Sequence, residues 1–374
     1  MKILLAGGGT AGHINPAISI ANEIKVRRPD TEFLFAAAPG GMEDTLVPKA
    51  GYPVAHIHVA GFRRSFSPSD IAHNVKAVSY LATAGIKASK ILKDFGPDAV
   101  IGTGGYLSGP VLLAAQKRKI PTFLHEANAF PGVTTKALAK RANVIMLAFP
   151  EAMEHLPKGR RYEVVGIPVR QSFVTTTKRE AREKLGLDDH FTILSFGGSQ
   201  GALKINEIAA DIMQWHCKMG EINHIHGYGK HGRDTFPKML KDRHIDLSGY
   251  PRIQAKEYID NMNLYVAAAD IVISRAGAST IMELEVAGKP SILVPYPYAA
   301  ENHQYYNAKV LADAGASILV EEKDYDREAL LTKLKELYQD PKRLSEFSQN
   351  ASKLAVLDTA EKIYNIIMTE LEKK

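Results

Sequence analysis

The chain has 374 residues, of which 45% are hydrophobic and 24% are charged. This is the composition of a globular protein, and the length suits two domains of ordinary size. No apolar stretch reaches about 18 residues, so we expect no membrane-spanning helix, and the short apolar run at the start does not fit a signal peptide. The single cysteine, Cys217, allows no internal disulfide, which suits the cytoplasm.

The net charge of +6 is distributed unevenly between the two halves of the chain. Residues 1–166 hold 20 lysines and arginines against 12 aspartates and glutamates, whereas the remainder holds 27 against 29. A basic half favours a polyanionic partner, either nucleic acid or an acidic lipid surface, although solvated lysines without any partner would give the same count. A nucleic-acid-binding module is disfavoured, because no aromatic platform or recognition motif accompanies the lysines.

Short apolar runs alternate with helical patterns along the whole chain, which is typical of βαβ units on parallel sheets. We therefore predict an α/β fold of two doubly wound, Rossmann-like domains facing a cleft. The predicted domains are residues 1–166 and 167–357, and a C-terminal helix at about 358–374 would pack back on the first. The predicted strands are 2–6, 33–37, 99–102, 122–125, 144–149, 192–196, 223–225, 271–274, 291–295 and 317–320, and helices are predicted at 16–28 and 69–95.

Three glycine turns follow predicted strands, at residues 7–12, 102–110 and 197–201. The first matches G-x-G-x-x-G, which alone is a weak signal for a dinucleotide. The second predicted strand ends in Ala36-Ala37-Ala38-Pro39, without the acidic residue that would hold a ribose, so NAD binding is disfavoured. Free backbone N–H groups at a helix N-terminus suit an anion such as a diphosphate, although glycines also serve simply to turn the chain tightly.

Several side chains near these turns could act on a hydroxyl group. His13 follows the first turn, where the positive field of a helix N-terminus favours neutral imidazole, which can accept a proton from an attacking hydroxyl. A local packing or capping role is the alternative. His125 and Glu126 end another predicted strand and form a second base candidate, and Asn128 could bind a sugar hydroxyl.

The most specific pattern lies in residues 274–280, Ser-Arg-Ala-Gly-Ala-Ser-Thr, followed by Glu283. Backbone and hydroxyl donors there would bind a phosphate, and a carboxylate one turn later would accept from ribose hydroxyls. Thr280 and Glu283 also fit a capping box, which is a purely local interpretation. Downstream, His303, Gln304 and Asn307 open another predicted helix, where they suit a sugar with several hydroxyls.

Seven motifs together resemble the MurG family of UDP-N-acetylglucosamine transferases, which convert lipid I to lipid II in peptidoglycan synthesis. The resemblance covers essentially the whole chain. Two positions depart from many relatives, since Ala127 replaces a glutamine and Ile167 an asparagine, and both concern details of acceptor contact. The motifs are GGGTAGHINPA at 7–17, GTGGYLSGP at 102–110, HEAN at 125–128, GIPVR at 166–170, GGSQGA at 197–202, SRAGASTIMEL at 274–284 and ENHQYYNA at 301–308.

The resemblance implies a GT-B hexosyltransferase that inverts the anomeric carbon and needs no cofactor and no metal. The C4 hydroxyl of the acceptor would attack while UDP leaves, with His13 as first choice of base and Glu126 as second. The resemblance implies that Thr10, Ala11, Gly12, Gly104, Tyr106, His125 and Asn128 bind the acceptor. It implies that the donor is bound by Arg170, Ser199, Gln200, Asn206, Ile259, Arg275, Ser279, Thr280, Glu283, His303, Gln304 and Asn307.

The implied partners are UDP-GlcNAc, lipid I, an anionic membrane surface and other proteins of cell-wall synthesis, and no nucleic acid. We expect a peripheral protein at the cytoplasmic face of the bacterial cell membrane, with a role in cell shape and division. The membrane candidates are the loop 61–66 and the basic residues Lys117, Arg118, Lys119, Lys136, Lys140 and Arg141. One apolar face of the helix 69–95 is a further candidate, although such a face more often packs into a core. Two related activities stay open: glycosyl transfer to diacylglycerol and epimerisation of UDP-GlcNAc.

Overall fold

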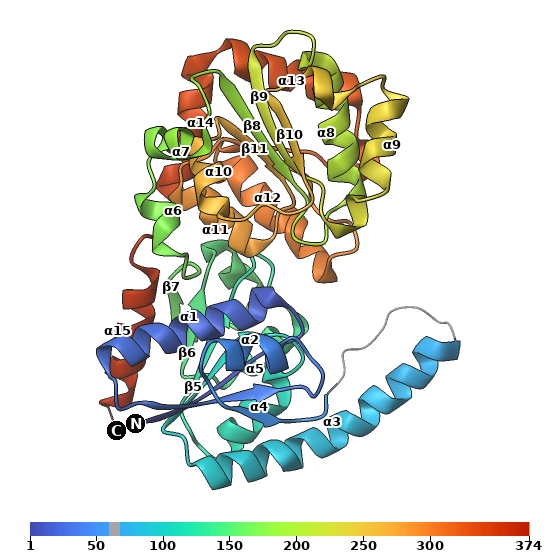
Figure 1. Ribbon diagram of the computed structural model, residues 1–374. Helices are drawn as coiled ribbons and strands as arrows, with labels where there is room; N and C mark the ends of the chain where they lie inside the picture. The colour runs from blue at the N-terminus through green and yellow to red at the C-terminus, as the bar shows by residue number, and fades with distance from the viewer. Residues whose placement is uncertain (60–67, 374) are drawn as a thin grey trace. The chain divides into compact units, whose positions relative to one another are not determined.

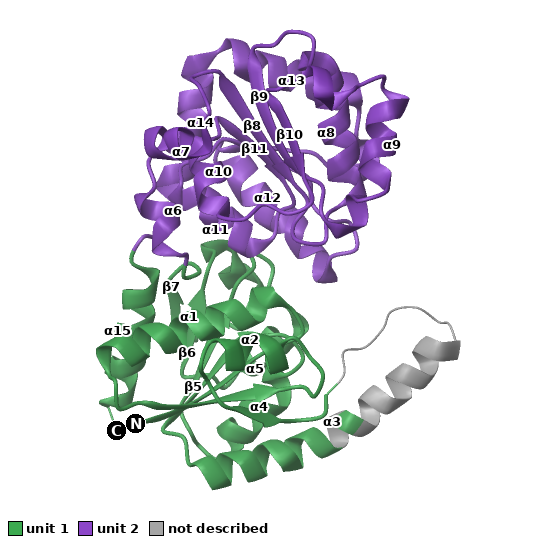
Figure 2. Cartoon of the chain, viewed as in Figure 1, with its two compact units in different colours: residues 1–168, 358–374 green, residues 169–357 purple. Residues whose placement is uncertain are grey.

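The computed structural model describes residues 1–59 and 68–373, with the side chains of 68–79, 81 and 82 left out. The chain divides into two compact units, shown in green and purple in Figure 2. Unit 1 comprises Met1–Pro168 and Asp358–Lys374, and unit 2 comprises Val169–Leu357. Each unit contains one wholly parallel sheet with helices between its strands, which confirms the predicted α/β class (Figure 1). None of the described helices is long and apolar enough to cross a membrane.

Unit 1 is built on a seven-stranded sheet in the order β3-β2-β1-β4-β5-β6-β7. The strand order reverses between β1 and β4, so the loops after these two strands diverge and leave room for a ligand at their carboxyl ends. The strands are β1 (Lys2–Gly7), β2 (Glu32–Ala37), β3 (Val54–His56), β4 (Ala99–Gly104), β5 (Thr122–Glu126), β6 (Val144–Leu147) and β7 (Tyr162–Val164).

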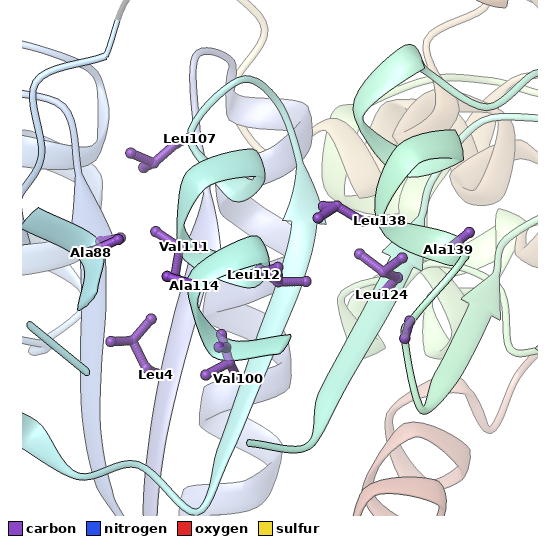
Figure 3. Close-up of a cluster of buried hydrophobic side chains, with 14 of the residues drawn as sticks. Leu4, Ala88, Val100, Leu107, Val111, Leu112, Ala114, Leu124, Leu138 and Ala139 are labelled. Carbon is purple, nitrogen blue, oxygen red and sulfur yellow. The ribbon is translucent and has the colours of Figure 1, made fainter. Parts of the chain in front are cut away.

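Helices cover both faces of this sheet, because the central strands are apolar on both sides. Figure 3 shows one of the two cores, in which Leu4 and Val100 from the sheet meet Val111 and Leu112. On the other face, Ile363 from the end of the chain is buried with α1 residues, so the C-terminal helix packs on α1. The helices are α1 (Ala11–Arg27), α2 (Glu43–Lys49), α3 (Pro68–Phe95), α4 (Ser108–Lys117), α5 (Val133–Ala139), η1 (Pro150–His155) and α15 (Thr359–Leu371).

Unit 2 is built on a six-stranded sheet in the order β10-β9-β8-β11-β12-β13, which reverses between β8 and β11. Its strands are β8 (Phe191–Phe196), β9 (Ile222–Gly227), β10 (Ile253–Lys256), β11 (Ile271–Ser274), β12 (Ser291–Leu293) and β13 (Ser317–Leu319). Its helices are α6 (Gln171–Thr175), α7 (Lys178–Leu185), α8 (Leu203–His216), η2 (Lys230–Gly232), α9 (Thr235–Asp242), η3 (Leu247–Gly249), α10 (Met262–Ala268), α11 (Ala278–Val286), η4 (Ala300–Asn302), α12 (His303–Asp313), η5 (Glu322–Asp324), α13 (Arg327–Gln339) and α14 (Pro341–Leu354).

Two differences from the sequence-based elements concern the site. The first helix was predicted to begin at Pro16, a residue favoured at helix starts, but α1 begins at Ala11 and contains Pro16. Its N-terminus therefore lies directly on the first glycine turn. The short strands β3, β7 and β10 were not predicted, since three or four residues carry little periodic signal.

Candidate active site

The first and second glycine turns of unit 1 are in contact at the carboxyl ends of β1 and β4. Gly105 has φ +77°, and a Cβ there would lie 2.1 Å from the carbonyl oxygen of Gly8. Gly104 has φ +105°, and its Cβ would lie 2.5 Å from Nδ1 of His13. Only glycine permits this conformation and this closeness, so the turns pack backbone against backbone with the His13 ring beside them.

His13 is held by a pair of reciprocal contacts with β4. Its Nδ1 lies 3.0 Å from the carbonyl oxygen of Thr103, and the Thr103 hydroxyl donates to the His13 carbonyl over 2.6 Å. A carbonyl oxygen can only accept, so Nδ1 carries the proton in the neutral ring and Nε2 is the basic nitrogen. This is the tautomer that a general base needs.

Three consecutive backbone N–H groups stand open at the start of α1. Thr10, Ala11 and Gly12 donate no hydrogen bond to any part of the chain that the structure describes. Thr10 precedes the helix in an extended conformation, and its side chain forms no cap. Together with the helix dipole, these donors suit an anion, which is the class of ligand that the glycine turn predicts.

Tyr106 lies over the first glycine turn. A Cβ on Gly9, which has φ +86°, would come within 2.7 Å of the Tyr106 ring. Tyr106 is 37% exposed, and burial raises the pKa of its hydroxyl, with a further rise from the charge of Glu43. A neutral phenol beside the open amides can donate to an anionic ligand.

The structure gives His125, Glu126 and Asn128 local roles. His125 is 1% exposed and its Nε2 donates to the carbonyl of Gly166 over 2.8 Å, while burial lowers the pKa of the ring. The Glu126 carboxylate is 4% exposed and accepts from the backbone and side-chain nitrogens of Asn128 over 3.0 and 3.2 Å. Its second oxygen accepts from Gly132 over 3.4 Å. These bonds tie the Glu126 oxygens to their own loop, which makes Glu126 the weaker candidate for the base.

In unit 2 a pocket opens at the carboxyl ends of β8 and β11, where the strand order reverses. Its walls come from the third glycine turn, the N-terminus of α11 and the segment between β12 and α12. Three of the predicted donor residues, Arg275, Thr280 and Gln304, line it, and the lining residues Gly198 and Gly201 are the direct neighbours of Ser199 and Gln200. The lining residues are Phe196, Gly197, Gly198, Gly201, Ala202, Arg275, Gly277, Thr280, Tyr296 and Gln304.

The N-terminus of α11 supplies open donors to this pocket. The helix is preceded by Gly277, which makes no side-chain cap, so the capping-box interpretation of Thr280 with Glu283 is wrong. Thr280 is the third helical residue instead. The N–H groups of Ala278, Ser279 and Thr280 form no hydrogen bond within the described chain and suit a phosphate.

Glu283, one turn further along α11, is the most electrostatically perturbed residue of the site. Burial raises its pKa from 4.5 to about 7, and the nearby charge of Arg170 opposes this rise. Arg170 is exposed and precedes α6, with its guanidinium 5.1 Å from the centre of the Phe173 ring. A half-buried carboxyl with a pKa near neutrality is typical of a binding or catalytic site.

Arg275 lines the pocket, but the chain already uses its guanidinium. It donates to the carbonyl oxygens of Val294 and Pro295, each over 3.1 Å, and pairs with Glu322 at 2.5 Å. It also lies 5.4 Å from the Tyr296 ring centre. Arg275 therefore orders the loop after β12. The backbone N–H groups of α11 are the better hydrogen-bond donors to a phosphate.

Gln304 and His303 begin α12 beside the pocket. The side-chain oxygen of Gln304 accepts from the N–H of Tyr296 over 3.0 Å, which turns its amide nitrogen to the remaining side. His303 directs Nδ1 to the carbonyl of Ala300 at 2.7 Å. Glu301 and Asn302, just before them, both have φ +52°, a strained conformation for residues other than glycine.

The other residues predicted to bind the sugar donor differ in how deeply they are buried. Asn206 and Asn307 are 1% and 0% exposed, and their amides donate to the carbonyls of Tyr228 and Ala276, so they support loops rather than line the pocket. Ser199 and Gln200 are exposed at the tip of the third glycine turn. Ile259 is 5% exposed, in the loop after β10.

A buried histidine network, which the sequence did not lead us to expect, lies in unit 2 next to β8. The Ser195 hydroxyl lies 2.8 Å from both Nε2 of His224 and Nδ1 of His226, and His216 joins His224 at 3.0 Å. Nε2 of His226 contacts Asn206 at 3.2 Å. Burial lowers the pKa of His216 to about 4 and that of His226 to about 3, so the network is neutral near pH 7. The alternating histidines of β9 were the available signal.

Family models match both units of the chain. The glycosyltransferase family 28 N-terminal domain matches residues 3–147, and the glycosyltransferase family 28 C-terminal domain matches residues 192–363.

Two bacterial relatives are named UDP-N-acetylglucosamine--N-acetylmuramyl-(pentapeptide) pyrophosphoryl-undecaprenol N-acetylglucosamine transferase. The one from Desulforudis audaxviator is 39% identical over 98% of both chains. The one from Thermoanaerobacter is 42% identical over 98% of this chain and 99% of its own.

Solved structures give the same fold. The crystal structure of Acinetobacter baumannii MurG superposes with a TM-score of 0.78 at 27% identity and covers 98% of this chain and 99% of that one. A UDP-GlcNAc 2-epimerase from Neisseria meningitidis matches with a TM-score of 0.67 at 14% identity, over 99% and 100% of the two chains. At that identity the likeness concerns the fold alone.

Proposed function

Because the chain belongs to the family of UDP-N-acetylglucosamine–N-acetylmuramyl-(pentapeptide) pyrophosphoryl-undecaprenol N-acetylglucosamine transferases, we propose that it glycosylates lipid I. In this reaction the C4 hydroxyl of the acceptor MurNAc attacks the anomeric carbon of GlcNAc in UDP-GlcNAc. UDP leaves, the configuration inverts and lipid II forms. One observation carries this proposal: the Thr103 carbonyl fixes the tautomer of His13, next to three backbone N–H groups that have no partner in the described chain. An attacking hydroxyl on a diphosphate-linked acceptor needs both a base and a site for the anion.

Unit 2 is the proposed donor site. The amides of Ala278, Ser279 and Thr280 would bind the diphosphate of UDP-GlcNAc and offset the charge that develops when UDP leaves. Glu283 would accept from the ribose hydroxyls, while Gln304 and His303 would contact sugar hydroxyls. The uracil would bind near Ile259 and the third glycine turn, where Asn206 and the histidine network stabilise the loops.

Unit 1 is the proposed acceptor site. The acceptor diphosphate would bind to the amides of Thr10, Ala11 and Gly12, with Tyr106 at its side. Nε2 of His13 would take the C4 hydroxyl proton as the glycosidic bond forms. Glu126 is not needed for that step, because its oxygens already accept from the following loop.

A lipid-linked acceptor requires contact with a membrane surface, and we place that contact on unit 1. The helices α3, α4 and α5 pack side by side and expose Ile86, Leu113 and Val133, by 75%, 43% and 69% respectively. Apolar side chains flanked by cations suit an anionic lipid interface. The predicted contacts in loop 61–66, and the side chains of Ile71, Val75, Lys76, Val78, Leu81 and Ala82, lie outside the described residues. The cations that we propose to attract anionic headgroups are Lys117, Arg118, Lys119, Lys136, Lys140 and Arg141.

The decisive experiment supplies radiolabelled UDP-GlcNAc to the purified protein with and without a lipid I analogue. We expect label on the lipid, and UDP release, only when the analogue is present. Label in UDP-ManNAc without an acceptor, or on diacylglycerol when this is supplied, would overturn the proposed reaction. Sedimentation with anionic and with zwitterionic vesicles tests the membrane surface, and binding to anionic vesicles should weaken as salt rises.

The base assignment has its own test. We expect His13→Ala to lose transfer while retaining UDP-GlcNAc affinity, since the donor residues lie in unit 2. The matched variant Glu126→Gln keeps an acceptor oxygen for the loop amides and should retain most activity. Near-normal turnover in His13→Ala would refute its role as base.

A further inference from the structure

A buried carboxylate lies directly beneath the first glycine turn of unit 1. Glu43, the first residue of α2, is 0% exposed, and its Oε1 accepts from the N–H of Gly9 over 2.5 Å. A Cβ on Gly8 or on Gly41 would come within 2.3 or 2.1 Å of the two carboxylate oxygens. Three glycines therefore enclose this one side chain.

The enclosure is chemically unusual because it is incomplete. The second oxygen, Oε2, is buried and accepts no hydrogen bond from the part of the chain that the structure describes. Burying a carboxylate with an unpaired oxygen is costly, so a purely structural role would be served better by an apolar residue. The hydrogen bond to Gly9 is therefore the contact that explains a carboxylate at this position.

Because of this hydrogen bond, the backbone N–H groups at the first glycine turn point in two different directions. The N–H of Gly9 points inward to Glu43, whereas those of Thr10, Ala11 and Gly12 are left for a ligand. Gly9 has φ +86° and also carries the Tyr106 ring, so the bond to Glu43 fixes the surface on which that ring packs. Glu43 thus reaches both the open amides and Tyr106 through one residue.

We propose that Glu43 is a positioning residue for the acceptor diphosphate. It holds the Gly9 amide inward and thereby aligns the three outward amides and Tyr106 on the ligand. This inference rests on the proposed function of unit 1 as the acceptor site. Glu43 does not touch the ligand, and it acts through a hydrogen bond that needs an acceptor oxygen rather than a negative charge.

The test compares three substitutions of Glu43 in steady-state transfer to a lipid I analogue. Glu43→Gln keeps an oxygen at the Oε1 position, so the KM for the acceptor should stay within about threefold of wild type. Glu43→Ala removes the oxygen, and Glu43→Asp withdraws it by one methylene, so both should raise the acceptor KM about 10- to 100-fold. The KM for UDP-GlcNAc should not change in any of them.

A matched control lies one residue further along α2. Asp44 accepts from the N–H of Gly40 over 2.8 Å and contacts His56 at 2.6 Å, but does not touch Gly9. Asp44→Ala should leave the acceptor KM unchanged, and urea unfolding of every variant separates misfolding from misalignment. If Glu43→Ala does not fold, the comparison of Glu43→Asp with Glu43→Gln decides.

Three results would overturn the inference. They are an unchanged acceptor KM in folded Glu43→Ala and Glu43→Asp, a Glu43→Gln enzyme as impaired as these, or an acceptor KM that falls in Glu43→Gln. The last would mean that the charge of Glu43 repels the ligand. Absence of any transfer by the wild-type protein would instead refute the proposed function, which keeps the two failures distinguishable.

Discussion

Replacing Glu283 by glutamine probes the electrostatics of the donor site. Burial raises the pKa of Glu283 from 4.5 to about 7, so near neutral pH the unliganded protein holds this carboxyl about half protonated. An ionised carboxylate can accept from both hydroxyls of a ribose, whereas the protonated form keeps a hydrogen to donate. Binding of UDP-GlcNAc is therefore expected to release a proton.

The magnitude follows from this pKa. Roughly a tenth of the Glu283 carboxyls are ionised at pH 6 and roughly nine tenths at pH 8. Since the apparent Kd varies inversely with the competent fraction, the Kd for UDP-GlcNAc should fall about tenfold between these pH values. In Glu283→Gln this fall should disappear, and affinity at pH 8 should drop about 10- to 100-fold because a neutral amide replaces a charged acceptor.

The same substitution should stabilise the unliganded protein at high pH. The folded state holds the Glu283 proton more tightly than the unfolded chain does, so the contribution of Glu283 to the stability of wild type falls as pH rises from about 4.5 through about 7. The difference between a pKa of about 7 in the folded state and the ordinary value of 4.5 corresponds to about 3 kcal/mol at pH 8. Glu283→Gln cannot ionise and should escape this loss, so its advantage should appear at pH 8 and be absent at pH 4.

Isothermal titration calorimetry with UDP-GlcNAc at pH 6, 7 and 8, in buffers of different ionisation enthalpy, measures the Kd and the released proton together. Urea unfolding of wild type and Glu283→Gln at pH 4 and pH 8 measures the difference in stability. Glu207→Gln is a matched control, since Glu207 lies on α8 of the same unit, is 38% exposed and pairs with Lys204. A wild-type Kd that is flat from pH 6 to pH 8, or a Glu283→Gln profile parallel to wild type, would refute the reasoning.

Three further predictions concern residues around the two half-sites. Gly104→Ala should abolish transfer but spare UDP-GlcNAc affinity in calorimetry, since its Cβ would lie 2.5 Å from Nδ1 of His13. As pH falls below 6.5, each of His216 and His226 should lower the free energy of unfolding by about 1.4 kcal/mol per pH unit, which urea unfolding measures. Their pKa values of about 4 and about 3 keep them unprotonated in the folded state, whereas the unfolded chain takes up the protons. Asn307→Ala should lower the free energy of unfolding by about 1–3 kcal/mol in the same assay and weaken UDP-GlcNAc binding. It removes the buried hydrogen bond from the Asn307 amide to the carbonyl of Ala276.

The strands and glycine turns could be predicted because their signals are local. Apolar runs located most strands to within one or two residues, and β11 was predicted with its observed bounds. The motifs identified the family, which the relatives and both family models confirm, and with it the enzyme class. The G-x-G-x-x-G turn indicated where open amides would stand, because a helix must leave its first N–H groups without internal partners.

The burial and the pairing of side chains were less predictable, because they depend on packing between segments that are distant in sequence. Asn206 and Asn307 stand beside family motifs, yet their amides face inward and hold loops. Arg275 carries a charge that suits a diphosphate, but Glu322, distant in sequence, pairs with it. Glu43 gave no sequence signal, since its partner Gly9 is reached only through tertiary structure.

These pairings bear on where the positive character of each site comes from. In the pocket of unit 2, Arg275 is already matched by Glu322, so its net field on a bound diphosphate is reduced. In unit 1, Glu43 adds a negative charge below the turn. In the proposed reaction both sites would therefore depend on helix N-termini, whose N–H dipoles are fixed before the ligand arrives. Fixed dipoles need no reorganisation when charge develops on the leaving UDP, so in unit 2 we expect the alignment of the backbone to affect the rate more than the number of cations does.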